Sequence, residues 1–176
     1  MDGSIAWTAK SFAEKIIDPA ITALPLDVDN GETVPGLRQL LLGTALKEES
    51  DLLHVEQLAN KDGTRGPAVG YFQMEPATYK DIWVNYLAYR KAVASKLRAM
   101  VKVDSGTPPA SLLKTDHVFA AVMARVHYRR AKGAIPAGGD VKAMAAYWKK
   151  YYNTPLGKGL ASDFEAKLTK ALAALV

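Results

Sequence analysis

The sequence predicts a mostly α-helical (α+β) fold for this chain of 176 residues. Apolar residues recur at helical steps over most of the length, and Pro or Asp marks several helix starts. One stretch near residues 51–73 is rich in turn formers and breaks this pattern. At 19.0 kDa the chain is most economically a single domain over residues 1–176. We therefore expect one helical domain with a small hairpin or irregular lobe that forms one wall of a cleft.

The first predicted helices begin at two prolines, Asp18-Pro19 and Val34-Pro35, because the first helical turn tolerates Pro. The second of these helices carries apolar residues at steps of four through residues 37–45, and this row ends at Glu49. Glu48 falls on a neighbouring side of the same helix. Periodicity alone therefore does not choose between the two carboxyl groups.

The helical signal stops after residue 50. Residues 54–58 alternate weakly between polar and apolar side chains, and residues 60–67 are dense in Gly, Asp, Asn and Pro. The lobe is therefore predicted to continue to about Gln73. Pro76 then opens a helix that reaches Leu97 with one interruption or bend. A loop follows it at residues 105–109.

Three further helices are predicted in the second half of the chain. Asp116 is a good N-cap for a nearly continuous apolar helix that Gly133 ends, and this helix is expected to be the buried centre of the fold. Asp140 caps the next helix, Val141 to Tyr152. Ser162 and Glu165 have the spacing of a capping box ahead of the last helix.

Composition limits the chemistry that the chain can perform. It has no Cys, which excludes a thiol nucleophile and a thiolate metal site, and its three His residues lack metal-ligand spacing, so no metal or cofactor is expected. The net charge of +5 predicts attraction to polyanions, either nucleic acid or the anionic envelope of a bacterium.

The chain also lacks the sequence features of a membrane protein or a secreted precursor. No apolar run approaches the ~20 residues of a membrane span, and the N-terminus has no signal-type apolar core. Export is therefore expected to use another route or carriage in a particle.

Two blocks of sequence carry a resemblance to a known family. Ala45 to Ser50 ends in the pair Glu49-Ser50, and the block Gly70 to Thr78 follows about twenty residues later. The first resembles the Glu-Ser pair of lytic transglycosylases and goose-type lysozymes. The second resembles their Gly-Leu-Met-Gln-x-x-Pro-x-Thr block.

A third stretch, Ala145 to Asn153, lies where that family has Ala-Tyr-Asn-Ala-Gly. It departs from the pattern, because Trp148 stands where Asn is usual and no Gly follows at once. With residues 153–159 behind it, this variant resembles muralytic proteins of bacteriophages. The resemblance covers roughly residues 37–160 and implies a lysozyme-like fold that acts on peptidoglycan glycan strands, either from the host cytoplasm before lysis or from a virion.

The resemblance implies cleavage of the β-1,4 bond between N-acetylmuramic acid and N-acetylglucosamine, with Glu49 as the catalytic acid. A carboxyl group at the rim of a hydrophobic core has a raised pKa, which suits Glu48 or Glu49 to general acid catalysis, and the family pattern selects Glu49. In residues 71–72, strand alternation would send one ring inward and its neighbour toward the groove. Tyr147 matches the family Tyr and is expected near Glu49. The predicted substrate contacts are Ser50, Tyr71, Phe72, Gln73, Tyr147 and Tyr151.

The number of carboxylates at the site separates two mechanisms. Hydrolysis normally needs a second carboxylate, and the candidates are Asp51, Glu56, Asp62 and Glu75. Lytic transglycosylases use one Glu as acid and then as base, and the hydroxyl of the muramic acid attacks to give a 1,6-anhydro product. We expect transglycosylation, with hydrolysis by a muramidase as its rival.

An alternative from another class is an inactive virion structural or DNA-contacting protein on the same fold, which the basic charge and the divergent third block would fit. Arg125 lies within an apolar helix. It is a candidate buried partner for a carboxylate such as Glu48 or Glu49.

Overall fold

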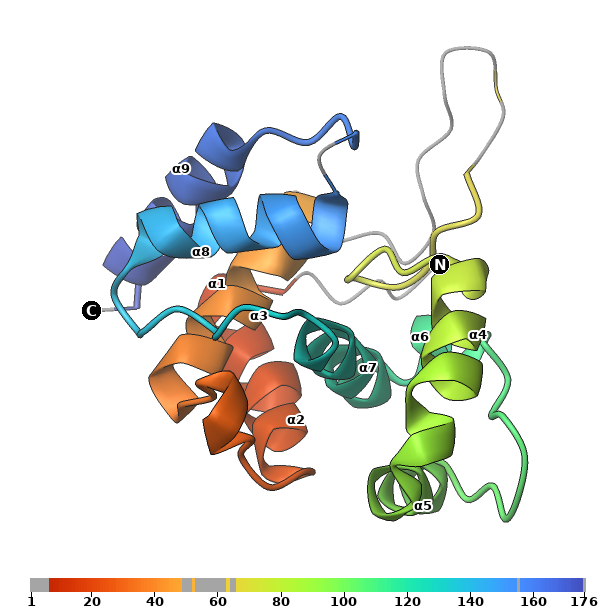
Figure 1. Cartoon of the computed structure of the whole chain (residues 1–176). Helices are drawn as coiled ribbons and strands as arrows, with labels where there is room; N and C mark the ends of the chain where they lie inside the picture. The colour runs from red at the N-terminus through yellow and green to blue at the C-terminus, as the bar shows by residue number, and fades with distance from the viewer. Residues whose placement is uncertain (1–6, 49–51, 53–62, 64–65, 155, 176) are drawn as a thin grey trace.

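The computed structural model describes residues 7–48, 52, 63, 66–154 and 156–175. These residues are mostly helical (Figure 1), which confirms the predicted mostly-α class. They contain no named strand, only an isolated antiparallel bridge between Val69 and Met74. The predicted hairpin or irregular lobe lies largely outside the described residues and stays a prediction.

The helical elements in chain order are α1 (Ala9–Phe12), the π-helical turn η1 (Ala13–Ile17), α2 (Asp18–Thr22), the 3-10 turn η2 (Val28–Asn30), α3 (Val34–Glu48), α4 (Pro76–Asn85), the 3-10 turn η3 (Leu87–Tyr89), α5 (Lys91–Met100), α6 (Leu112–Thr115), α7 (His117–Arg129), α8 (Val141–Trp148), the π-helical turn η4 (Lys149–Asn153) and α9 (Ala161–Ala173). The predicted interruption between Pro76 and Leu97 is confirmed, because α4 and α5 are separated by Tyr86 to Arg90.

The N-terminal helix begins earlier than Asp18-Pro19 predicts. Thr8 and Ser11 form a capping box that starts α1, and helical structure continues through η1 into α2. Pro19 lies in the first turn of α2, after a π-helical turn rather than after a loop. Pro19 therefore marks the change from a π-helical turn to an α-helix within a continuing helix, and not a helix start.

Helix α7 is the buried centre of the fold, as the apolar pattern predicts. Asp116 accepts a hydrogen bond from the backbone N–H of Phe119 at 2.9 Å, which confirms the predicted N-cap. Nine of its thirteen residues are buried. In Figure 1, α7 lies between the α4–α5 pair and the helices α2 and α3.

Helices α8 and α9 cover α3 from the other side (Figure 1). Asp140 caps α8 through the backbone N–H of Ala143 at 3.0 Å, as predicted. The capping box predicted at Ser162 is wrong, because the N-cap of α9 is Leu160 and no side chain caps it. Phe164 instead packs in the core against the Trp148 ring, with 5.4 Å between ring centroids.

Arg125 has a buried carboxylate partner, but this partner is Glu32 and not Glu48. The Arg125 Nη2 donates to Glu32 Oε2 at 2.6 Å, and Arg129 Nε donates to Glu32 Oε1 at 2.7 Å. Arg125 also donates to the backbone carbonyls of Ile21 and Leu24 at 2.8 and 3.2 Å. It therefore satisfies carbonyls at the end of α2 and joins that segment to α7.

Burial alone would raise the pKa of Glu32, but hydrogen bonds from Arg129, Arg125 and the Asp27 backbone N–H outweigh it and lower the pKa to about 2. Both Arg125 and Glu32 have fully buried side chains. This ion cluster supports the fold on the side of α7 that faces α2. Among the described residues, no helix has the length and apolar character to cross a membrane.

Candidate active site

The three sequence blocks meet at the C-terminal end of α3. From the third block, the Trp148 indole Nε1 donates to Glu48 Oε1 at 3.0 Å. From the same helical stretch, the Tyr152 hydroxyl donates to the Phe72 carbonyl at 2.7 Å. One short segment therefore connects the acidic block to the Gly70–Met74 turn, although the first bond spans 100 residues of sequence.

Glu48 is a partly buried carboxyl group with an unusual affinity for protons. Burial raises its pKa from 4.5 to about 7, although the hydrogen bond from Trp148 and the charges of Lys47 and Lys167 act in the opposite direction. The Lys47 ammonium lies 5.7 Å from the centroid of the Trp148 ring. A carboxyl in this place stays substantially protonated near neutral pH, which is what general acid catalysis requires.

Tyrosine rings form the inner wall next to Glu48. The Tyr128 and Thr44 hydroxyls lie 2.6 Å apart, and Thr44 is one helical turn before Glu48 on α3. The Tyr152 ring lies 5.1 Å from that of Tyr128. Burial, with the nearby charge of Glu48, raises the pKa of Tyr152 well above its usual value, so this wall is neutral and apolar apart from its hydroxyls.

The Gly70–Met74 turn is held by its own backbone and amide groups. Gly70 has a positive φ of 76°, and a Cβ there would collide with the Leu113 carbonyl, so the position favours Gly. Gln73 also has a positive φ, of 44°. Its side-chain Nε2 donates to the Gly70 carbonyl at 2.8 Å, which gives Gln73 a structural role in the turn.

Tyr71 and Phe72 do not alternate between core and groove as expected. Both are buried, with 4% and 1% of their surface exposed, because the segment forms a turn and not a strand. Tyr71 packs between Phe12 and His117, with ring centroids 5.3 and 4.8 Å away. Neither ring offers a face to a sugar in this arrangement.

Tyr147 points toward the loop after α7 instead of toward the acidic block. Its hydroxyl donates to the Gly133 carbonyl at 2.8 Å, and only 7% of its surface is exposed. The Tyr151 ring packs 4.7 Å from the Tyr147 ring and is partly exposed. The side of α8 and η4 that reaches Glu48 and Phe72 is the one that carries Trp148 and Tyr152.

The predicted acid and several other candidates lie outside the described residues: Glu49, Ser50, Asp51, Glu56 and Asp62. Of the candidate second carboxylates, only Glu75 is described, and it is exposed at the N-cap of α4. In the described part of the chain, no group of three or more His, Cys, Asp or Glu residues could hold a metal ion.

Sequence reasoning did not assign Trp148, Tyr152 and Tyr128 to the site. The i, i+4 spacing of Trp148 and Tyr152 placed them on one helix face. A second signal was available, because Trp148 directly follows Tyr147 on a largely apolar helix. The indole N–H of a buried Trp needs a hydrogen-bond acceptor, and a carboxyl group is a strong acceptor.

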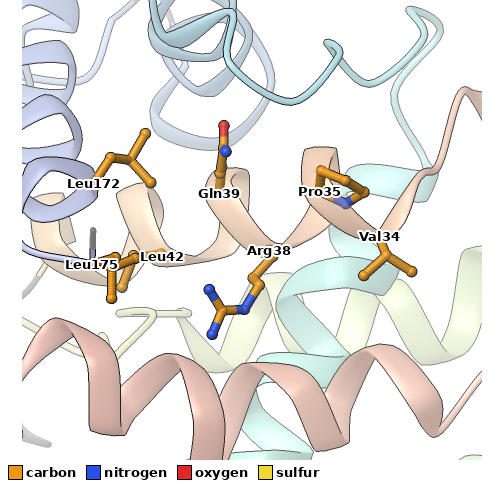
Figure 2. Close-up of a pocket in the computed structure, with 7 residues that line it drawn as sticks. All are labelled: Val34, Pro35, Arg38, Gln39, Leu42, Leu172 and Leu175. Carbon is orange, nitrogen blue, oxygen red and sulfur yellow. The ribbon is translucent and has the colours of Figure 1, made fainter.

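A separate hollow of about 250 Å³ lies between α3 and α9 (Figure 2). It is lined by Val34, Pro35, Arg38, Gln39, Leu42, Leu172 and Leu175. Its one charged residue, Arg38, forms an ion pair with Asp18, with 2.7 Å between Arg38 Nε and Asp18 Oδ1. The hollow is therefore mainly apolar and has no pair of titratable groups for acid–base chemistry.

Comparisons with protein-family models, with curated proteins and with solved structures find no match to this chain.

Proposed function

We propose that this chain is a lysozyme-like muralytic enzyme that cleaves the β-1,4 bond between N-acetylmuramic acid and N-acetylglucosamine in peptidoglycan. The observation that supports this proposal is the junction of three sequence blocks at the end of α3. Trp148 and Tyr152 bond to Glu48 and to the carbonyl of Phe72, and the proposed acid, Glu49, is the next residue of the first block.

The surroundings of α3's last turn support the proposed chemistry. The pKa of Glu48 is raised to about 7, mainly by burial, so a carboxyl group at this end of the helix is partly removed from water. One oxygen of Glu48 already accepts the Trp148 N–H. In the proposal Glu48 therefore supports the wall of the site, and Glu49 is the group that meets the glycosidic oxygen.

The proposed reaction uses one carboxyl group twice. Glu49 donates its proton to the glycosidic oxygen as the bond to the muramic acid C1 breaks. The carboxylate then accepts the proton of the C6 hydroxyl as that oxygen attacks C1, which closes the 1,6-anhydro ring and restores the acid. Hydrolysis is the alternative, in which water replaces the C6 hydroxyl. We further propose that the protein comes from a bacteriophage, as a lysis enzyme or a virion component.

The test compares two neighbouring carboxyl groups. Glu49→Gln should lower the rate of cell-wall clearing by at least about 10²–10⁴-fold, which is the usual contribution of general acid catalysis. Glu48→Gln should have a mild effect on the rate. Mass analysis of the released muropeptides should show 1,6-anhydro ends, whereas reducing ends would indicate hydrolysis.

Glu48→Gln is the matched control, because it makes the same chemical change one residue away. Equal loss in both variants, or loss only at position 48, would contradict the assignment of Glu49. A wild-type protein that is folded but clears no cell wall would contradict the enzyme proposal itself and favour the inactive virion protein.

A further inference from the structure

One pair of helices presents a group of positive charges. Residues 76–104, here called the basic lobe, hold six basic and two acidic residues, a net charge of +4. The basic residues are Lys80, Arg90, Lys91, Lys96, Arg98 and Lys102. In Figure 1 this lobe contains α4 and α5, and α7 lies between it and the helices α8 and α9.

The lysines of the basic lobe have no acidic partner in the described part of the chain. Lys80, Lys91, Lys96 and Lys102 are exposed, and none forms an ion pair there. The lobe's Asp81 pairs instead with Arg130, the C-cap residue of α7. The lobe therefore presents four ammonium groups that are solvated but not neutralised.

The two arginines of the lobe are already engaged. Arg98 Nε donates to the Gly106 carbonyl at 2.6 Å, and its guanidinium lies 5.3 Å from the Trp83 ring centroid. The Arg90 guanidinium lies 3.7 Å from the Tyr86 ring centroid. The flexible ammonium groups of the lysines, and not the guanidinium groups of the arginines, therefore remain available for a ligand.

The outer face of α5 lets a ligand come close to its lysines. Between its lysines this face carries the small exposed residues Ala92, Ser95 and Ala99, while Leu97 is fully buried. The apolar side of α5 faces the protein core, so it cannot insert into a lipid bilayer as an interfacial helix would. The outer face of α5 also has no Asn or Gln, and Arg98 is engaged, so it lacks the amide groups and the free guanidinium group that make bidentate contacts to adenine and guanine edges in duplex DNA.

We propose that the basic lobe binds the phosphate groups of a polyol-phosphate polymer attached to the bacterial cell wall, and so holds the enzyme on its substrate. This inference rests on the proposed function, because the wall is taken as the target. Flexible phosphodiester chains suit spaced lysines, since each phosphate can adjust to meet an ammonium group, and binding releases counterions. The docking surface lies on other helices than the proposed active site.

The test measures binding of purified poly(glycerol phosphate) to the full chain over a series of salt concentrations. The variant Lys91→Gln/Lys96→Gln/Lys102→Gln should lose at least about tenfold in affinity at low salt. Its plot of log affinity against log salt should flatten by about two units, because each contact with a flexible phosphate chain contributes about 0.7.

The matched control is Lys10→Gln/Lys142→Gln/Lys170→Gln, which removes the same charge from exposed positions of α1, α8 and α9. This control should bind the polymer nearly as well as the wild type. Wild-type affinity in the lobe variant would overturn the proposal, as would equal loss in both triple variants. Tighter binding of a short DNA duplex than of the polymer would overturn it in favour of nucleic acid.

Cleavage of a small, uncharged glycan fragment separates this inference from the proposed function. The lobe variant should cleave this fragment at the wild-type rate, because its substitutions lie outside the proposed active site. Polymer binding that depends on the lobe, in a protein that cleaves nothing, would support the docking surface and contradict the enzyme proposal.

Discussion

The raised pKa of Glu48 predicts that this carboxyl group destabilises the folded protein at alkaline pH. Its pKa is about 7 in the folded state, compared with 4.5 for an ordinary Glu side chain. A group with a raised folded pKa binds its proton more tightly when folded, so its stabilising contribution is complete below pH 4.5 and is lost as pH rises through 7. A shift of this size corresponds to about 3 kcal/mol, at 1.36 kcal/mol per pKa unit.

Glu48→Gln removes this pH-dependent cost and keeps an oxygen that can accept the N–H of Trp148. We expect the variant to be more stable than the wild type at pH 8, by up to about 3 kcal/mol. The two proteins should have similar stability at pH 4, because Glu48 is then protonated. Urea unfolding at one-unit steps from pH 4 to pH 8 measures the difference in free energy of unfolding.

Glu14→Gln is the control for this series, because Glu14 is an exposed carboxyl group on a helical turn. It should not gain the stability at pH 8 that Glu48→Gln gains, because the side chain of Glu14 is already in contact with solvent. The reasoning is refuted if Glu48→Gln is no more stable than the wild type at pH 8, or if its advantage is the same at pH 4. Either result would mean that Glu48 is not desolvated in the folded protein.

Three other predictions concern packing contacts of the fold. Glu32→Gln should destabilise the protein by about 3 kcal/mol at pH 7, because it leaves buried arginines without a countercharge. The pKa of Glu32 is about 2 in the folded protein, so this difference in stability should disappear as pH falls from 4.5 to 2. Unfolding measured over a series of acidic pH values can check this. Gly43→Ala should destabilise by about 1–3 kcal/mol through a collision with the Phe164 ring, and Phe164→Leu should suppress the added loss in a double-mutant cycle. Tyr147→Phe should cost about 1 kcal/mol, because its hydroxyl bonds to the Gly133 carbonyl, and an unchanged melting temperature would contradict that structural role.

Local chemistry in the sequence determined where most helices begin and break. Val34-Pro35 predicted the start of α3, and the side chains of Asp116 and Asp140 predicted the caps of α7 and α8. These signals act over three or four residues, so they can be read without knowing the rest of the fold. The capping box predicted at Ser162 failed because a favourable spacing does not fix where the chain enters α9.

The sequence also determined which segments form the candidate site, because the three blocks, separated by up to about 100 residues, can be recognised from their residue patterns alone. It could not decide which side chains in those blocks meet. Periodicity places a residue on a face of its own helix, whereas its neighbours depend on how other helices pack against that face.

Only the tertiary structure decided that Trp148 bonds to Glu48 while Tyr147 bonds to Gly133, and that Arg125 pairs with Glu32. The same limit applies to the raised pKa of Glu48. A pKa depends on desolvation and on hydrogen bonds and charges from distant segments, and here these include the hydrogen bond from Trp148 and the charge of Lys167. The sequence therefore determined the helices and the candidate carboxyl groups, and packing between helices determined which groups leave water and which partners they find there.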